Sequence, residues 1–587
     1  MRHKLYGLGV VVAVAVLAAA ATIPIVILLI LSVKTAINIR ARGVTFANFS
    51  AVLGDPTTWR SVENTLVYTV GSAFGAVLLG TLMAWAISTV NVPFRNVLRV
   101  MPILVLILPP LVKDPAWIIV FAKGNGLFDI FLHSTFGVGS PFDVYSLYGM
   151  ITVTAIFGAP FAYTIMLQPF GSIDRSMVEA SAVSGSPLWY TLRRVVFPMT
   201  RPAIASAITF QVITIAGGFE TPILIGTPAG IPTFMGQIYT LVSDPVQGLN
   251  IAAAQSSVYL ILTVAMVACY LLATRNERRF VAISGRGHDP VRIEAPVLRW
   301  VLLAIIILYT ILGFLIPLVI TVLTSLLPFY SASKGNPFHD FSLSNFDDVL
   351  HSAQVVTAIE TSTVVAAIAA AGVVVVGGLL AFVSLKGTSS LRRVCEFIGM
   401  LPIAIPGLVY SVGLLLTVLS IPGLAPVAYG TKGLMIVAEI LVFIPLGMRM
   451  MSSAIIQIQN DLLEASRMGG ASMGRTVRSI LLPLLRPAII YTLSVTFVLA
   501  YRELGAVVLL VARNTTVVPF ASLTFWVTGG FTQLAALNVI TLIVPLIFVG
   551  LLAVADRLTS RRPARLAVPV VPVAAAPPTL ALEKELV

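Results

Sequence analysis

Residues 173–204 read IDRSMVEASAVSGSPLWYTLRRVVFPMTRPAI, and residues 458–489 read IQNDLLEASRMGGASMGRTVRSILLPLLRPAI. The second stretch repeats the first 285 residues later without a gap, and 12 of the 32 aligned positions are identical. Each copy is a polar, arginine-bearing interruption of an otherwise apolar sequence. Repeated polar loops between hydrophobic segments indicate a duplicated membrane protein with two matching docking points on one face.

The composition excludes an ordinary soluble domain. Of the 587 residues, 58% are hydrophobic and 10% are charged, whereas soluble domains carry about 25% charged residues. Apolar runs of the roughly 20 residues that cross a bilayer as a helix recur along the whole chain. They are continuous, whereas the strands of a membrane barrel alternate over about ten residues. We therefore predict an all-α integral membrane protein with about twelve transmembrane helices.

The predicted spans divide equally between the two halves of the chain. They cover residues 8–33, 64–90, 97–121, 146–168, 203–226 and 251–274, and then 298–325, 358–385, 395–420, 432–454, 487–511 and 533–555. The third and ninth spans are interrupted by prolines, which a membrane helix tolerates where it is buried in protein or lines a cavity.

The spans form a six-plus-six tandem repeat. The first repeat covers residues 1–285 with its polar loop at 170–200, and the second covers 286–565 with its polar loop at 455–485. An even number of spans returns the second copy to the same side of the membrane, so a pseudo-twofold axis along the membrane normal is expected. The remaining residues, 566–587, are rich in Pro and Ala, and we predict a disordered tail.

The positive charge of the chain follows membrane topology. The net charge is +13, and the arginines concentrate on one side: the segment between the sixth and seventh spans is strongly basic, whereas the loop 227–250 has no Lys or Arg. This positive-inside pattern predicts cytoplasmic termini and argues against nucleic-acid binding. The first apolar run continues through Leu31, longer than the core of a cleaved signal, so we expect a retained helix.

The polar loops have their own local structure. In the first copy, apolar residues at Ile173, Met177, Ala180 and Val183 have helical spacing, which predicts an amphipathic helix outside the bilayer. A glycine, Gly185, ends that helix by permitting a sharp turn or a close backbone approach. Prolines at 202 and 487 fit the first turn of the membrane span that follows.

These loops resemble the cytoplasmic "EAA" loop of permease subunits in binding-protein-dependent ABC importers. The resemblance rests on a Glu-Ala pair with a glycine six residues after the glutamate, present twice in register. The matching residues are Glu179, Ala180, Ser181 and Gly185 in the first copy and Glu464, Ala465, Ser466 and Gly470 in the second. The third position is Ser in both copies instead of the Ala that gives the motif its name.

The resemblance implies a type I ABC importer permease of the bacterial inner membrane. In that family the loop forms a coupling helix, so residues 174–190 and 459–475 would each dock one ABC ATPase subunit. The alternative is that both helices lie on lipid headgroups, aided by nearby arginines. No Gly-Lys dipeptide occurs in the chain, so the phosphate-binding loop of an ATPase is absent. We predict a transport subunit without cofactors of its own, with ATP and Mg bound by the partners.

The substrate is expected to reach this permease on an extracytoplasmic binding protein. Fused twelve-span permeases of this kind are typical of the ferric iron group, so the resemblance implies ferric iron as the substrate. Thiamine, 2-aminoethylphosphonate and polyamine are the alternative substrates. Two stretches, 217–239 and 500–511, resemble the iron group and contain Glu220 and Glu503. An acid at membrane depth is a functional hypothesis by default, and a carboxylate suits a hard cation such as Fe(III). No residue is firmly assigned as a metal ligand.

Simpler roles for the same acids remain open. Glu503 could pair with the adjacent Arg502 or with another helix, and Glu220 could lie at the outer interface. Glu439 has Thr154 at the matching position of the first repeat, so it is not a repeat-symmetric site. The outer loops 34–63 and 326–357 could anchor at the membrane interface or bind a partner. A secondary transporter driven by an ion gradient, or a membrane scaffold, would leave the duplicated EAA-like loop unexplained.

Overall fold

A computed structural model gives the arrangement of the chain. It describes residues 8–38, 40, 43–173, 181, 183–243, 248–274, 296–329, 341–458 and 460–560. The predicted tail and both predicted cytoplasmic termini lie outside these residues, as does most of the basic linker between the repeats. The regular structure of the described residues is helical.

Ten helical segments are long and apolar enough to cross a membrane, and two bent helix pairs raise the number to twelve among the described residues. The straight spans are formed by α1 (Leu8–Ser32), α3 (Pro56–Thr89), α8 (Leu147–Gly171), α10 (Leu188–Thr191) with α11 (Phe197–Gly217), α13 (Leu249–Thr274), α14 (Leu298–Thr310) with α15 (Ile316–Ser325), α17 (Ala353–Lys386), α21 (Lys432–Ile456), α23 (Met473–Thr476) with α24 (Leu482–Tyr501), and α26 (Phe531–Ser560). The twelve-span prediction is confirmed.

The third and ninth spans are broken where prolines were expected to interrupt them. The first break joins α4 (Arg95–Leu98) and α5 (Met101–Leu104) to α6 (Pro110–Phe121) at an angle of 97°. The second joins α18 (Ser389–Met400) to α19 (Gly407–Ser420) at 106°. Pro109 and Pro406 precede the second helix of each pair, in extended conformation. Proline at that position removes a backbone donor and fixes the turn into the next helix.

The remaining helices are short and lie between the spans. They are α2 (Ala47–Gly54), α7 (Leu127–Phe136), α12 (Phe234–Ser243), α16 (Ser344–His351), α20 (Ala425–Ala428), α22 (Asn460–Met468) and α25 (Val518–Thr528). Single π-helical turns, η2 (Leu192–Val196) and η7 (Val477–Leu481), connect α10 to α11 and α23 to α24.

The predicted bounds of the fifth and eleventh spans were wrong. The helices run over Trp189–Gly217 and Gly474–Tyr501, so each begins at least 13 residues earlier and ends at least nine residues earlier than the hydropathy predicted. Pro202 therefore lies inside α11 instead of opening the span. The apolar residues beyond the first helix, such as Leu224 and Ile225, are buried in protein instead of facing lipid, which hydropathy alone does not distinguish.

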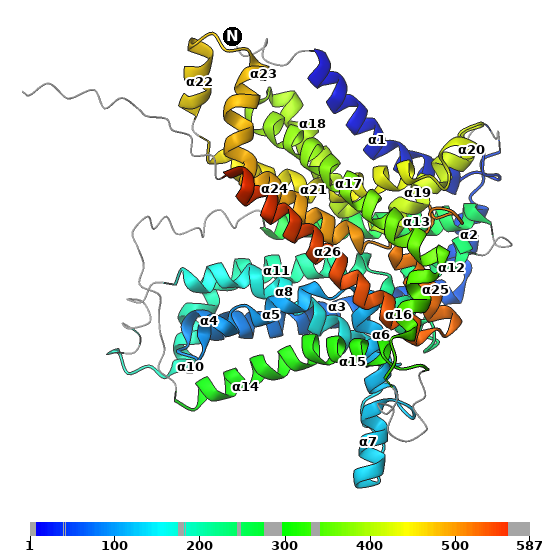
Figure 1. Ribbon diagram of the computed structural model, residues 1–587, viewed down its shortest axis with the longest axis vertical. Helices are drawn as coiled ribbons and strands as arrows, with labels where there is room; N and C mark the ends of the chain where they lie inside the picture. The colour runs from blue at the N-terminus through cyan, green and yellow to red at the C-terminus, as the bar shows by residue number, and fades with distance from the viewer. Residues whose placement is uncertain are drawn as a thin grey trace, which may run out of the picture.

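The two repeats exchange their first spans. The helix α1 packs against α18 and α19 of the second repeat, while α14 and α15 pack against α5 and α6 of the first (Figure 1). One hydrogen bond fixes each crossing: Tyr410 Oη donates to the Ala21 carbonyl at 2.7 Å, and Trp117 Nε1 donates to the Leu312 carbonyl at 3.2 Å. The two halves therefore repeat in sequence but pack together into a single helical bundle.

Small residues allow the closest helix contacts inside each repeat. A Cβ on Gly80 of α3 would lie 2.6 Å from the carbonyl oxygen of Ala159 in α8. Gly377, at the matching place in α17, would meet the backbone of Gly447 in α21 at 2.6 Å. Such glycines are typical of helix pairs in membranes, where close backbone packing replaces the hydrophobic effect.

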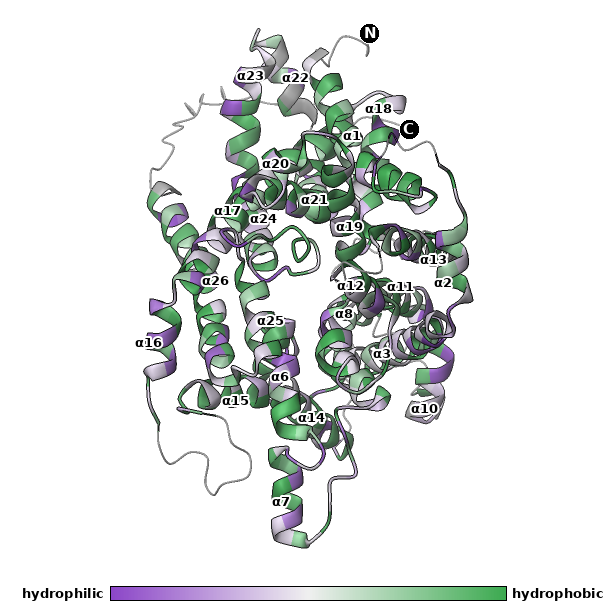
Figure 2. Ribbon diagram, turned by 90° about the vertical axis from the view of Figure 1, so that its right-hand side faces the viewer, coloured by the Kyte–Doolittle hydropathy of each residue, from purple (hydrophilic) through white to green (hydrophobic). Residues whose placement is uncertain are grey.

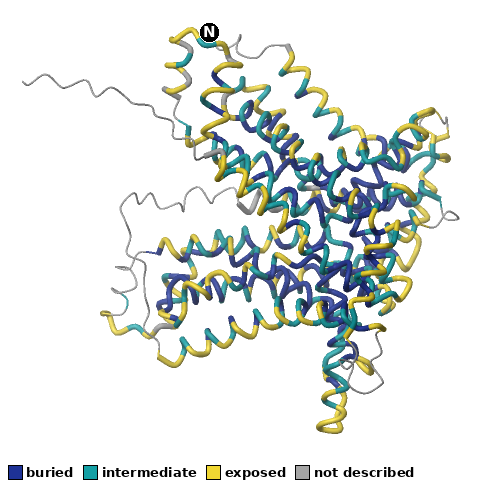
Figure 3. Tube along the Cα trace, in the orientation of Figure 1, coloured by how far each residue is buried: buried dark blue, intermediate teal, exposed yellow. Residues whose placement is uncertain are grey.

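The spans lie side by side in two groups that diverge toward the end carrying α10 and α22 (Figure 1). Buried residues gather at the opposite end, where the groups meet (Figure 3). The outer helices are apolar along their length, with polar residues toward their ends (Figure 2). Exposed Phe74, Val375 and Leu551, each at least 65% accessible, show a surface suited to lipid rather than water.

Candidate functional site

The EAA-like loops end in the same backbone turn. Gly185 and Gly470 both have φ of +73°, a left-handed conformation that glycine adopts without strain. A Cβ at either glycine would meet no atom within 4 Å. Of the two reasons considered for these glycines, the structure therefore supports a sharp turn and not a close approach.

Each turn is a helix cap. The backbone N–H of Ser186 donates to the Ser181 carbonyl at 3.2 Å, and that of Ala471 donates to the Ser466 carbonyl at 3.1 Å. A bond of this span closing on a left-handed glycine is the Schellman motif, which satisfies the last carbonyls of a helix. The predicted end of the helix at the glycine is confirmed in the second copy, where α22 ends at Met468.

The third residue of each motif ties the loop to the helix that follows. Ser181 Oγ lies 2.7 Å from Thr191 Oγ1, and Ser466 Oγ lies 2.8 Å from Thr476 Oγ1. The two threonines are 3% exposed. This bond gives a physical role to Ser where the motif usually has Ala. The threonines were not singled out from the sequence, although they occupy an identical position in the two copies.

The described part of the loops exposes apolar side chains. Val183 is 89% exposed, Met468 is 86% exposed and Leu462 is 45% exposed. Glu464 and Ala465 are also exposed, whereas Glu179 and Ala180 lie outside the described residues. These apolar side chains lie in the segments that connect the long spans, so the hydrocarbon of the bilayer is not expected to cover them.

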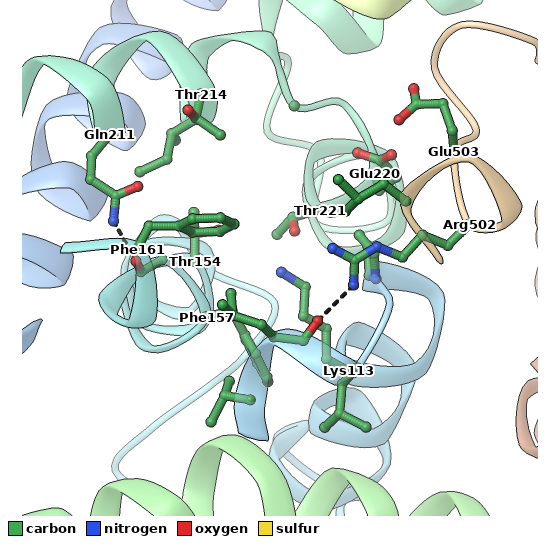
Figure 4. Close-up of a pocket in the computed structure, with 18 of the residues that line it drawn as sticks. Lys113, Thr154, Phe157, Phe161, Gln211, Thr214, Glu220, Thr221, Arg502 and Glu503 are labelled. Atoms are coloured by element: carbon green, nitrogen blue, oxygen red, sulfur yellow. Dashed lines mark hydrogen bonds between the residues drawn. The ribbon is translucent and has the colours of Figure 1, made fainter. Parts of the chain in front are cut away.

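The two acids predicted to line the path come together. Glu220 and Glu503, one from each repeat, line a single cavity of about 300 Å³ (Figure 4). Both lie just after the helices α11 and α24: Glu220 follows the break at Gly218 and Phe219 and opens the next helical turns, and Glu503 lies in the non-helical segment that begins at Arg502. Glu220 Oε2 accepts from the Phe219 N–H at 3.2 Å, and Glu503 Oε1 accepts from the Ala506 N–H at 3.1 Å. Glu220 is therefore a cavity residue and not an outer-interface residue.

Two cations line the same cavity. The Lys113 ammonium lies 4.6 Å from the centre of the Phe157 ring, and Arg502 Nη1 donates to the Leu106 carbonyl at 2.8 Å. The described residues show no ion pair between Arg502 and Glu503, so the simple pairing considered for these neighbours is not found. Sequence reasoning missed Lys113, although a Lys-Asp pair inside a predicted span is itself a signal.

A polar wall completes the cavity on the side of the first repeat. Tyr68 and Thr154 share a hydrogen bond of 2.9 Å between their hydroxyls, and Gln211 Nε2 donates to the Gly158 carbonyl at 2.5 Å. Behind the lining, the buried Asp114 accepts from Thr221 Oγ1 at 2.7 Å. Thr154 thus contributes to the cavity, whereas Glu439, at the matching position, is buried in α21 and does not line it.

The lining does not form a tight metal site. Within the described residues, no three His, Cys, Asp or Glu side chains are placed to hold one ion. The cavity instead combines two carboxylates, two cations and aromatic rings. It can therefore contact groups of either charge on a small solute.

Two further cavities open on the ends opposite the EAA-like loops. One of about 820 Å³ is lined by residues of α3 and α12, including Arg60 and Glu63, and by Asp55, which precedes α3. The other, of about 670 Å³, lies at the start of α17 and includes Arg513 and Asn514. They occupy corresponding places in the two repeats, beside a repeated bond: the Phe234 N–H donates to Thr65 Oγ1 at 2.9 Å, and the Val518 N–H donates to Ser362 Oγ at 2.8 Å.

Comparison with known proteins matches both halves. The family model of the binding-protein-dependent transport system inner membrane component covers residues 76–281 and 361–563. A protein named as a ferric transport system permease, FbpB 1, of Haemophilus influenzae is 25% identical over 74% of this chain and 68% of its own length. The ferric transport system permease FbpB of Actinobacillus pleuropneumoniae is 24% identical over 81% of this chain and 68% of its own.

Among solved structures, a bacterial ABC transporter involved in alginate import aligns with a TM-score of 0.36 and 18% identity, over 42% of this chain and 87% of that chain. The two family matches confirm the predicted fold class, an all-α membrane protein with the permease fold of type I ABC importers in two repeats. The chain belongs to the family of inner-membrane components of binding-protein-dependent transport systems, as the multi-pass permease of a bacterial ABC importer.

Proposed function

We propose that this permease forms the path by which ferric iron crosses the bacterial inner membrane. The observation that carries the proposal is the convergence of Glu220 and Glu503, from opposite repeats, on one cavity. Carboxylate oxygens are hard ligands that suit a hard cation. Similarity to two ferric transport permeases supports the same substrate.

A loose arrangement of ligands suits a path better than a tight site does. A conducting site must bind well enough for entry and weakly enough for release. Two carboxylates offset by Lys113 and Arg502 would hold Fe(III) only briefly. The ion would then leave toward the cytoplasm once the cavity opens to that side.

The two cations also favour a second candidate, 2-aminoethylphosphonate. This substrate carries an ammonium and a phosphonate, which the acids and the Lys113 and Arg502 side chains could contact together. Thiamine and polyamines carry positive charge and gain nothing from the two cations. Family membership leaves no reason to prefer transport driven by an ion gradient.

The energy would enter at the two EAA-like loops. Residues 174–190 and 459–475 would each dock one ABC ATPase subunit, with ATP and Mg bound by those subunits. Exposed Val183 and Met468 support docking, because apolar side chains outside the membrane favour a covering partner. In this role Glu179, Ala180, Glu464 and Ala465 would belong to the contact with the ATPase and not to any acid-base step.

A binding protein would dock on the opposite face. The cavities beside α12 and at the start of α17 open there and contain charged residues such as Arg60 and Arg513. With the loops facing the cytoplasm, both chain termini would also be cytoplasmic. Closure of the ATPase pair would then switch access from one end of the diverging helices to the other.

Uptake by the reconstituted transporter tests the substrate. The permease, its ATPase subunits and its binding protein are placed in liposomes, and uptake of radioactive iron is measured for Glu220→Gln and Glu503→Gln. We expect at least a tenfold loss in each. Glu396→Gln is the control, because Glu396 is exposed and pairs with Arg392 at 2.8 Å. Normal iron uptake by both cavity variants, or uptake of 2-aminoethylphosphonate instead of iron, would overturn the ferric assignment.

A further inference from the structure

An apolar groove on the outside of the first repeat is not part of the transport path. It has a volume of about 680 Å³ and lies between α3, the end of α8 and the segment from α10 to α11. Its walls include Leu78, Phe170, Ile204 and Ile208. Phe74 and Trp189, at its edges, are 66% and 71% exposed. The groove therefore opens on the lipid-facing surface.

Two arginines lie on this apolar surface. Arg193 and Arg201 both line the groove and are exposed. No hydrogen bond or ion pair joins either one to another described residue. The two arginines are eight residues apart on a largely helical segment, so their Cα atoms are separated by about 12 Å along the helix axis. Arg193 is the nearer of the two to the EAA-like loop. Arg201 thus lies about three turns into the apolar span Trp189–Gly217, where an unpaired charge is costly.

The second repeat solves the same problem internally. Arg486, which aligns with Arg201, has its Nη2 2.7 Å from Asp556 Oδ1 and also donates to the Asp556 carbonyl. Asp556 belongs to α26, and the corresponding helix of the first repeat, α13, contains no acidic residue. The counter-ion that the protein supplies to Arg486 is therefore not supplied to Arg201 by the matching helix.

We propose that the groove binds an anionic glycerophospholipid of the cytoplasmic leaflet, with its phosphate between Arg193 and Arg201. Arginine favours phosphate because its planar guanidinium donates two parallel hydrogen bonds. The acyl chains follow the apolar wall toward the centre of the bilayer. Only the leaflet depends on the orientation proposed above, and the lipid site is independent of the transported substrate.

Native mass spectrometry of the purified full-length permease tests the site. The protein in detergent is titrated with phosphatidylglycerol and, separately, with phosphatidylcholine of the same acyl chains. We expect one phosphatidylglycerol to bind at least tenfold more tightly than phosphatidylcholine. Arg201→Gln, alone and with Arg193→Gln, should remove that preference and leave phosphatidylcholine binding unchanged. Arg392→Gln is the matched control, because it removes an exposed arginine that lies away from the groove and pairs with Glu396.

The groove position is tested separately from the charge. Ile204→Trp, which fills the groove and keeps both arginines, should also weaken phosphatidylglycerol binding. Equal binding of the two lipids by the natural protein, or full preference in the double arginine variant, would overturn the proposal. So would loss of ATPase-subunit binding in the arginine variants with lipid preference intact, because the arginines would then belong to a protein interface.

Discussion

The hydroxyl of Ser466 lies 2.8 Å from that of Thr476, and the same bond recurs at 2.7 Å in the first repeat. In the second repeat it joins α22, which carries Glu464, to α23, the short helix leading into the next span. Two connections, a glycine turn and a hydrogen bond between two hydroxyls, fix the angle between the two parts of each loop. Movement imposed on α22 by the ATPase subunit proposed to dock there would then pass to the span without being absorbed by the turn.

Thr476→Val should weaken the connection between α22 and α23 in the second repeat. The substitution keeps the shape of the side chain and leaves Ser466 without its partner, so we expect a loss of about 1 kcal/mol in local stability. The transport rate per ATP hydrolysed should fall, and Thr476→Ser, which keeps the hydroxyl, should restore it. The ratio of uptake to ATP hydrolysis in proteoliposomes measures this, and an unchanged ratio in the valine variant would show that the bond is not used in coupling.

The glycine turns predict an order of substitutions. At φ of +73° an L-residue is strained by roughly 1–2 kcal/mol, and asparagine tolerates this conformation best. Since a Cβ has open space at Gly185 and Gly470, strain and not collision sets the effect. Coupled uptake should therefore decrease in the order Gly, Asn, Ala, Val, most strongly when both glycines are replaced.

Gly474→Ala supplies the control for that series. A Cβ at Gly474 also meets nothing within 4 Å, and its φ is not positive. This variant should transport normally. If Ala at position 470 were also harmless, the left-handed turn would not be the reason for the glycine.

Repeat-related glycines inside the bundle predict effects on stability. At Gly80 and Gly377 an added Cβ would lie 2.6 Å from backbone atoms of the neighbouring helix, and backbone cannot move aside as a flexible side chain does. Overpacking of this kind typically costs about 1–3 kcal/mol. Gly80→Ala and Gly377→Ala should each lower the Tm of the purified protein, whereas Gly550→Ala, in open space, should not. Equal Tm values would show that the helices separate without cost.

The topology could be predicted because apolar runs and a repeated stretch are read directly from the order of the residues, without knowledge of contacts between distant segments. Sequence reasoning predicted Glu220 and Glu503 as path residues because their segments resemble the ferric iron group of this family. It could not find the contact of Arg502 with the Leu106 carbonyl, which joins residues 396 positions apart. The ends of the fifth and eleventh spans were misjudged for a similar reason, because an apolar segment buried in protein reads like one that faces lipid.

Lys113 separates the two candidate substrates. Its ammonium is in the cavity with Glu220 and Glu503, where it repels a metal cation and attracts a phosphonate. Lys113→Met, which keeps most of the length of the side chain, should therefore leave ferric uptake unchanged or raise it about twofold. If the permease instead carries 2-aminoethylphosphonate, the same variant removes a charged partner of the substrate, and hydrogen bonds to charged groups are worth about 1.5–3 kcal/mol. Uptake at low concentration would then fall by at least tenfold.

Parallel assays with radioactive iron and labelled 2-aminoethylphosphonate distinguish these outcomes. Lys432→Met is the control for the loss of one positive charge, because Lys432 lies away from the cavity and pairs with Glu360 at 2.8 Å. A tenfold fall in ferric uptake by Lys113→Met would contradict the proposal that the two acids hold the cation while Lys113 opposes it.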